Sequence, residues 1–338
     1  MTNFKQYFRS HLKANIESMI YIFLAAILLT FLIGICIQPT SYYDYSTAQR
    51  VKSYQSTLYI PVIFISILAY VLPVKEFSFF KKRINLDCAY SLPISRKAMG
   101  AVHYLTGLTI LFGAYTLSYI TNFILLLSRG EGYFNFTPMI GHYILCLIIG
   151  FSIYSIMVFV FNEANTKGDG IWFMILYTFV FALAITTIRK IIDYNDRFID
   201  ANNLIPWGLF IKINSSYQSV VEIHLADRMK FWTSPESVKW FIIWMNLGIA
   251  SVVAFILRFG NRRMEKTEEI SDSYFGFRTL IPIYAISAMI LSESSNYIIL
   301  WVILELLTFI GYTIYRRGFH YKKSDVITMC MLLIFLFI

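Results

Sequence analysis

Charged residues are scarce in this sequence of 338 residues, and their scarcity excludes most classes of protein. Asp, Glu, Lys and Arg make up 14% of the chain, whereas hydrophobic residues make up 57%. A soluble domain carries about 25% charged residues, so a soluble chain of this composition would lack the polar surface it needs. The apolar residues also form long uninterrupted runs, unlike the alternating strands of an outer-membrane barrel. The composition predicts an all-α, polytopic membrane protein.

Cysteine patterns and catalytic motifs are also missing. The four cysteines form no CxxC pair, and the five histidines are scattered at positions 11, 103, 142, 224 and 320, so no metal centre is expected. The sequence contains no Gly-x-x-x-x-Gly-Lys-Ser/Thr loop, no His-Glu-x-x-His and no Gly-x-Ser-x-Gly. Glu268-Glu269 resembles the start of an intramembrane-protease motif, but Ser273 replaces its Arg. The chain is therefore expected not to be an enzyme and to bind no cofactor itself.

Six apolar runs have about the 17–25 residues needed to cross a hydrocarbon core about 30 Å thick. These runs are Met19–Ile37, Leu58–Val74, Val102–Leu127, Met139–Phe161, Ile171–Ile188 and Trp240–Leu257. No small-residue cleavage site follows the first run, which is therefore expected to be a retained helix rather than a signal peptide. Two further spans are predicted at Phe275–Leu291 and Tyr297–Tyr315. A third candidate, Val326–Ile338, either spans the membrane or inserts part of the way.

The positions of the basic residues explain the net charge of +9. With the N-terminus inside, the predicted inner segments, together with Arg278 at the inner edge of the seventh span, hold 19 Lys and Arg residues, and the outer segments hold nine. This asymmetry follows the positive-inside rule. It predicts a protein of the cytoplasmic membrane with a cytoplasmic N-terminus, whose basic surface faces anionic lipid and not nucleic acid.

Residues 1–18 predict an amphipathic helix. Phe4, Phe8 and Leu12 repeat at helical spacing, whereas Lys5 and Arg9 fall on another face. Such a helix next to a spanning segment is expected to lie along the inner membrane surface. It is either an elbow that frames the cytoplasmic mouth of a transporter or a simple anchor.

The segment between the second and third spans, residues 75–101, has the most distinctive pattern. A short helix is predicted with Phe77, Phe80 and Ile84 on one side. Pro93 disfavours helix just before it, and Ser95 is expected to cap a new helix that leads into the third span. The segment is either a surface for a cytoplasmic motor subunit or a solvated basic loop that obeys the positive-inside rule.

The external loop 189–239 is long and contains two apolar patches, at residues 205–211 and 216–231. Such patches would be unfavourable in water, so helices that lie on or dip into the outer leaflet are predicted. They either roof a translocation path or form a packing cap.

Two segments of the chain resemble one family. Residues 90–97 read Tyr-Ser-Leu-Pro-Ile-Ser-Arg-Lys and precede an apolar helix that contains Gly, which resembles the permease subunits of type-two ABC exporters. The basic stretch Arg258–Lys266 resembles the end of the six-helix core in that family. The resemblance covers about residues 1–270. It implies an interfacial helix at 1–18, a six-span core at 19–260, and a basic link with two or three additional spans at 261–338.

The resemblance implies a non-catalytic subunit of an ATP-driven exporter. Two copies of a separate ABC ATPase would carry ATP and Mg²⁺ and would drive a homodimer or heterodimer of permease chains. The expected cargo is amphipathic: an antimicrobial peptide, a peptide toxin, a drug or a lipid. The residues expected to contact the ATPase are Phe77, Phe80, Lys81, Arg83, Ile84, Asp87, Leu92 and Arg96, with further cytoplasmic contacts at Arg262, Arg263 and Glu265.

Polar residues inside the apolar runs help to distinguish an ABC exporter from other classes of membrane protein. Glu305 is costly within a bilayer and is expected either to pair with another helix or to line a path. Asn122 and Asn246 are expected to form hydrogen bonds between helices. An ion-coupled carrier would have several intramembrane acids and inverted repeats, but only Glu305 is evident. A membrane-embedded enzyme or sensor is the third alternative.

Overall fold

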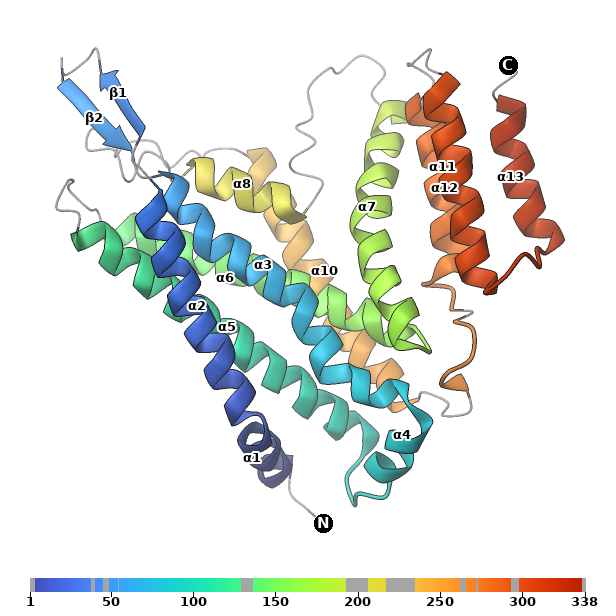
Figure 1. Ribbon diagram of the computed structural model, residues 1–338, viewed down its shortest axis with the longest axis horizontal. Helices are drawn as coiled ribbons and strands as arrows, with labels where there is room; N and C mark the ends of the chain where they lie inside the picture. Colours follow the sequence, from blue (N-terminus) through green and yellow to red (C-terminus); the bar gives the residue numbers. More distant parts are fainter. Residues whose placement is uncertain are drawn as a thin grey trace. The chain divides into compact units, whose positions relative to one another are not determined.

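The computed structural model describes residues 4–37, 40–44, 49–53, 55–128, 136–192, 206–216, 235–261, 266–271, 273–292 and 298–335. These residues are mainly helical (Figure 1). In chain order the elements are α1 (Phe4–Ala14), α2 (Ile16–Cys36), β1 (Thr40–Asp44), β2 (Gln49–Ser53), α3 (Gln55–Phe77), the 3-10 helix η1 (Ser78–Lys81), α4 (Arg83–Tyr90), α5 (Arg96–Ser128), α6 (Phe136–Glu163), α7 (Lys167–Ile192), α8 (Pro206–Ser216), α10 (Pro235–Gly260), α11 (Phe277–Ser292), α12 (Ile298–Arg316) and α13 (Lys323–Phe335).

Six helices within the described residues are long and apolar enough to cross a membrane. The candidate spans are Ile16–Cys36, Thr57–Lys81, Arg96–Ser128, Met139–Glu163, Lys167–Ala184 and Ser237–Gly260. Each overlaps one of the six apolar runs found in the sequence, so the six predicted helices are confirmed. A helix needs about 20 apolar residues to cross the hydrocarbon core. The arrangement is that of a multi-pass helical membrane protein.

Helices also form in the three C-terminal apolar runs. The apolar part of α11, Phe277–Ala288, is shorter than a full span. Helix α12 has 19 residues and carries Glu305, and α13 has 13 residues. Inside the loop between the first two spans, β1 and β2 pair as an antiparallel hairpin, with Thr40 opposite Ser53 and Asp44 opposite Gln49. This hairpin departs from the all-helical expectation.

The described chain divides into two compact units, and the first comprises Met1–Glu76, Leu92–Val158 and Pro206–Gly260. In this unit α2 packs along α5, α10 packs against α5, and α8 packs against α10 (Figure 1). The α2–α5 contact includes a buried hydrogen bond of 2.6 Å between the hydroxyls of Thr30 and Ser118. Small and hydroxyl side chains at a helix crossing let the backbones approach, which is how helices associate in lipid.

The predicted N-terminal amphipathic helix is confirmed as α1, although α1 ends before the predicted segment 1–18 does. Helix α1 ends at Ala14 and α2 begins at Ile16, with Asn15 at the turn between them. Helix α1 packs on α5 through a half-buried face that carries Tyr7, Phe8 and His11. The basic residues Lys5, Arg9 and Lys13 are exposed.

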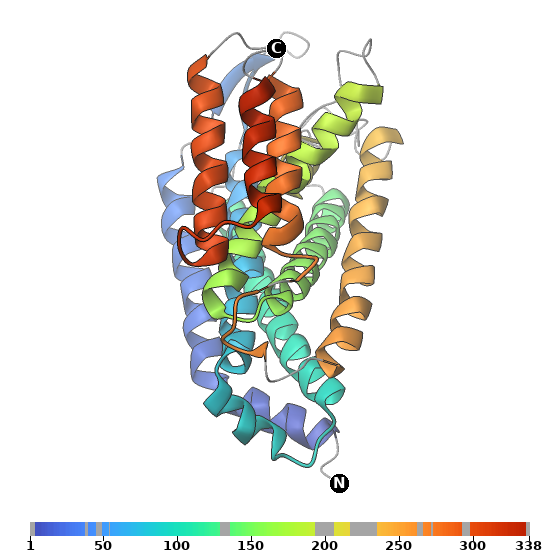
Figure 2. The same ribbon diagram turned by 90° about the vertical axis from the view of Figure 1, so that its right-hand side faces the viewer.

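The second unit comprises Phe77–Ser91, Phe159–Ile205 and Asn261–Ile338. Helix α11 packs against α7, α12 and α13 (Figure 2). Phe173 of α7 and Phe277 of α11 are buried, and their ring centroids lie 4.8 Å apart in an edge-to-face arrangement. Ser271 links the segment before α11 to α7, because its hydroxyl donates to Asp169 at 2.5 Å and accepts from the Asn165 backbone N–H at 2.8 Å.

Part of the loop 189–239, which the sequence predicts to be external, is described. Residues 206–216 form α8, in which Leu209, Phe210 and Ile213 are buried, so the first apolar patch does form a helix. The second patch lies outside the described residues except for its first residue, Ser216.

Candidate functional site

The segment after α3 is anchored by two aromatic side chains of the second unit. Phe77 and Phe80 are 0% and 2% exposed, and their ring centroids lie 6.3 Å apart. The single helix expected here is divided into the last residue of α3, the one-turn helix η1, and α4. Both aromatic residues belong to the set predicted to contact an ATPase, and in the structure both are packed inside the protein.

Lys81 is also buried, and it binds the end of α6. Its Nζ donates to the carbonyl oxygens of Phe161 at 2.8 Å and Ala164 at 2.6 Å, with Asn162 at 3.4 Å. The last carbonyls of a helix have no partners within the helix and carry the negative end of its dipole. An ammonium group donates hydrogen bonds to these carbonyls, and its positive charge interacts favourably with the negative end of the dipole. Lys81 therefore caps α6, a role that its place in a basic loop does not reveal.

Arg83 joins the start of α4 to the loop before α11. Its Nε donates to the Thr267 carbonyl at 2.9 Å, and its Nη2 lies 3.7 Å from Glu269 Oε1. The backbone N–H of Arg83 lies 3.4 Å from Glu268 Oε1. The Arg83 and Glu269 side chains are 56% and 58% exposed, and such exposed ion pairs contribute little, about 0–1 kcal/mol. The Glu268-Glu269 pair thus occupies a surface loop beside an arginine.

Other residues of the predicted docking set face outward. Ile84 is 76% exposed on α4, and Asp87 is exposed on the same helix. In the first unit, Leu92 is 41% exposed and Arg96 is exposed at the start of α5. The three further contacts predicted at Arg262, Arg263 and Glu265 lie outside the described residues.

The predicted cap of α5 is confirmed. The Ser95 hydroxyl accepts a hydrogen bond from the Ala98 backbone N–H at 3.3 Å. This is the N-cap interaction in which a short oxygen side chain binds an otherwise unpaired N–H of the first turn. The chain from Leu92 to Ser95 is the break predicted before the third span.

A second group of residues, absent from the sequence prediction, lies in the first unit. His11 of α1, Glu76 near the end of α3 and His103 of α5 lie together, and one ligand atom from each is within 4.8 Å of the others. The His11 Nε2 to Glu76 Oε2 distance is 3.1 Å, and the His103 Nδ1 to Glu76 Oε2 distance is 3.6 Å. The two imidazole centroids are 4.0 Å apart. We call these three residues the His–Glu cluster.

The His–Glu cluster is largely enclosed. The side chains of Glu76, His103 and His11 are 2%, 9% and 17% exposed. Gly107, one turn after His103 on α5, leaves room for the Tyr154 ring and for the stem of Glu76. The Tyr154 hydroxyl donates to the Tyr104 carbonyl at 3.1 Å.

The three polar residues predicted to lie inside the membrane have different surroundings. Asn122 is buried on α5, and its Oδ1 has no hydrogen-bond partner among the described residues. Asn246 is exposed, and its amide donates to the Ile242 carbonyl of its own helix at 2.9 Å. Within the described residues Glu305 also has a buried Oε2 that accepts no hydrogen bond. Asn122 and Asn246 belong to the first unit, and Glu305 belongs to the second.

His142 shows the polar contact between helices that was expected of the asparagines. Its Nε2 lies 2.8 Å from Asn214 Oδ1 of α8, and its Nδ1 lies 3.2 Å from the Tyr119 hydroxyl of α5. His142 is buried on α6. It joins three helices by hydrogen bonds inside the first unit.

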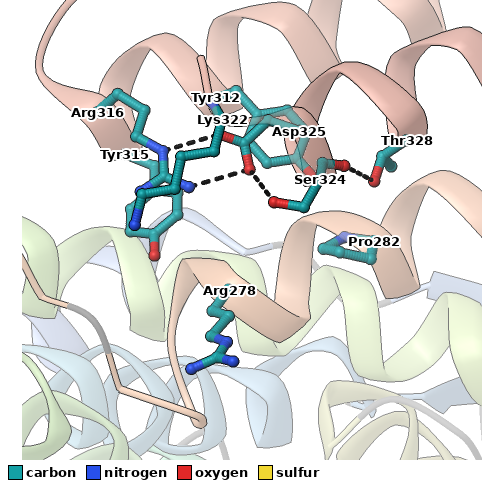
Figure 3. A pocket seen from close by; sticks show the side chains of 9 residues that line it. All are labelled: Arg278, Pro282, Tyr312, Tyr315, Arg316, Lys322, Ser324, Asp325 and Thr328. Atoms are coloured by element: carbon teal, nitrogen blue, oxygen red, sulfur yellow. Dashed lines mark hydrogen bonds and ion pairs between the residues drawn. The ribbon is translucent and has the colours of Figure 1, made fainter. Parts of the chain in front are cut away.

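A pocket of about 320 Å³ lies in the second unit. Figure 3 shows its lining, with Arg278 on one side and the Arg316–Asp325 pair on the other. Arg316 Nε and Nη2 donate to the two oxygens of Asp325 at 2.8 and 3.0 Å. Burial raises the pKa of Asp325, but the hydrogen bonds from Arg316, the Lys322 backbone N–H and Ser324, together with the charge of Arg316, lower it, and the pKa lies below its ordinary value. The bidentate pair links the end of α12 to the start of α13.

Comparison of the chain with protein-family profiles, with curated proteins and with solved structures finds no match. The function is therefore inferred from the residues of the chain itself.

Proposed function

We propose that this protein is the membrane-spanning subunit of an ATP-driven ABC exporter. The proposal is supported by six candidate spans, an amphipathic helix before the first span, and a surface helix between the second and third spans. It places the protein in the cytoplasmic membrane with the N-terminus inside, as the distribution of Lys and Arg favours. The C-terminal helices α11, α12 and α13 are additions to the six-span core.

The observation that carries the proposal is the exposed aliphatic side chain of Ile84 on α4. Helix α4 is short, and Ile84 at its second position is 76% exposed. Phe77, Phe80 and Lys81 fix the chain directly before it. Burial of this side chain against a partner would gain about 1.5–3 kcal/mol, which supports a docking role for α4.

The partner in this proposal is a separate ATPase. The chain has no phosphate-binding loop, so ATP and Mg²⁺ are bound by two copies of the partner. Closure of the two ATPase subunits pushes on α4 in each of two permease chains, and the spans rearrange around a central path. The cargo is an amphipathic peptide, drug or lipid.

Co-purification from native membranes tests the proposal. The chain is captured from mild detergent, and associated proteins are searched by mass spectrometry for a P-loop ATPase. We expect the ATPase with the unmodified chain and at least about tenfold less with Ile84→Glu, since about 1.4 kcal/mol of binding free energy is a factor of ten.

Phe319→Glu is the matched control for this experiment. Phe319 is 72% exposed in the loop between α12 and α13, so the substitution places the same charge at an equally exposed apolar position. Capture should be unchanged in this variant. Export by the purified chain alone, without any ATPase, would contradict the proposal and favour the ion-coupled carrier.

A further inference from the structure

The His–Glu cluster contains the donor atoms of a metal site. His11, Glu76 and His103 come from three helices and offer two imidazole nitrogens and one carboxylate oxygen. We propose that these three residues bind a divalent transition metal, of which Zn²⁺ is the best match, and that the metal fastens the interfacial helix α1 to the ends of α3 and α5. This site is independent of the proposed function.

The spacing of the donor atoms fits such an ion. Zinc lies about 2.0–2.2 Å from nitrogen and oxygen ligands, so ligand atoms at the corners of a tetrahedron lie about 3.3–3.6 Å apart. The two pairs that share Glu76 Oε2 measure 3.1 and 3.6 Å, to His11 Nε2 and His103 Nδ1. The ligand atoms of the two imidazoles lie within 4.8 Å of each other, so side-chain rotation that brings the rings closer would place all three donors on one ion.

The type of donor selects the class of metal. Calcium and magnesium prefer shells of oxygen atoms, whereas two imidazoles with one carboxylate are a known zinc set that leaves a fourth position open. The side chain of His11 is 17% exposed, against 2% for Glu76, so a metal can enter from the α1 side. Asn15 lies next to this side, with its Nδ2 3.3 Å from His11 Nε2.

Hydrogen bonding within the cluster does not satisfy every buried oxygen. Glu76 Oε2 faces both imidazoles, but Glu76 Oε1 accepts no hydrogen bond from the described residues. Lys75 Nζ lies 3.7 Å from this oxygen. A buried acceptor without a hydrogen bond is unfavourable. A metal ion that contacts both oxygens of this carboxylate would provide Oε1 with a partner as well.

The positive charge of Lys75 disfavours cation binding, because its ammonium lies close to the carboxylate of Glu76. The Lys75 side chain is 27% exposed, so its flexible stem can carry the charge into water when a metal binds. The carboxylate then neutralises half of the charge of the ion. The described neighbours of the cluster add no second acid, so the loaded site keeps a positive charge.

The test is metal binding to the full chain in detergent micelles, purified with a tag that contains no histidine and treated with a chelator. Bound zinc is counted after equilibration with Zn²⁺, and Co²⁺ is added separately because tetrahedral Co²⁺ absorbs visible light. We expect about one ion per chain and the tetrahedral Co²⁺ spectrum. His11→Ala should weaken zinc binding at least about 100-fold, since loss of a second-shell partner alone costs about 10–100-fold.

His320→Ala is the matched control, because His320 is exposed and belongs to the other unit. Its zinc affinity should equal that of the unmodified chain. His11 lies on the half-buried face of a terminal helix, so His11→Ala is expected to fold. A zinc-induced rise in melting temperature that His11→Ala abolishes also supports the site. No stoichiometric zinc in the unmodified chain, or equal binding in His11→Ala, would overturn the proposal.

Discussion

Substitution of Lys81 by Met removes the ammonium group that caps α6 and keeps a side chain of similar length. Lys81 is 2% exposed, and its ammonium makes two short hydrogen bonds, at 2.6 and 2.8 Å. A hydrogen bond that involves a charged group contributes about 1.5–3 kcal/mol. Part of this gain offsets the desolvation of the ammonium, which costs several kcal/mol. The substitution also leaves buried carbonyls without a donor, so we expect a net loss of about 2–4 kcal/mol in the free energy of unfolding.

The assay for this change is unfolding in detergent micelles, followed by loss of helical circular dichroism with heat or denaturant. The control is Lys82→Met, because Lys82 is the exposed neighbour and a surface change typically alters stability by less than about 0.5 kcal/mol. If Lys81→Met and Lys82→Met were equally stable, Lys81 would not hold the end of α6, and the anchoring role assigned to it would be wrong.

The same variants separate anchoring from docking. Lys81→Met should lower stability, whereas Ile84→Glu should lower ATPase capture and leave stability close to that of the unmodified chain. Ile84 is 76% exposed, so its replacement leaves no cavity. A stability loss in Ile84→Glu as large as that in Lys81→Met would show that α4 packs against the protein and is no free surface.

Two further predictions concern packing and pH. Gly107→Ala should destabilise the chain by about 1–3 kcal/mol, because the added Cβ would collide with the buried Tyr154 hydroxyl; thermal unfolding of the variant measures this, and an unchanged midpoint would refute the close approach. Asp325 has a lowered pKa in the folded chain, so its contribution to stability is present above the unfolded-state pKa of about 3.9 and is lost as pH falls through the folded-state pKa. The melting temperature of the unmodified chain should therefore fall more steeply below about pH 4 than that of Asp325→Asn, and parallel curves would contradict the role of Arg316.

Hydropathy is sufficient to predict the six long helices, because the length of an apolar run and the thickness of a bilayer are both local quantities. The Ser95 cap could be predicted for the same reason, since its partner is three residues away. The role of Lys81 could not be predicted from the local sequence. A lysine that orients a loop and a lysine that caps a helix 80 residues further on look the same in a sequence, and only the fold places Lys81 against the Phe161 and Ala164 carbonyls.

The hairpin was missed for a different reason. Residues 40–44 and 49–53 contain Tyr42, Tyr43 and Val51, which favour strands, but they lie in a stretch assigned as a loop because it separates two spans. The pairing of β1 with β2 shows that the connections between the spans of a membrane protein can have secondary structure of their own. Local strand signals therefore need to be read inside such connections as well as outside them.

The His–Glu cluster illustrates what helical periodicity in the sequence can predict and what it cannot. On α1, His11 falls on the same face as Phe8 and Leu12, and on α5, His103 stands in the buried row Met99, His103, Gly107 and Ile110. A polar side chain on an apolar face must find a partner when it is buried, so each histidine indicates a contact that is missing from its own helix. Periodicity does not tell which partner it is, because His11 and Glu76 are 65 residues apart. Two histidines on separate buried faces are a reason to look for one shared acid, and in this chain that acid is Glu76.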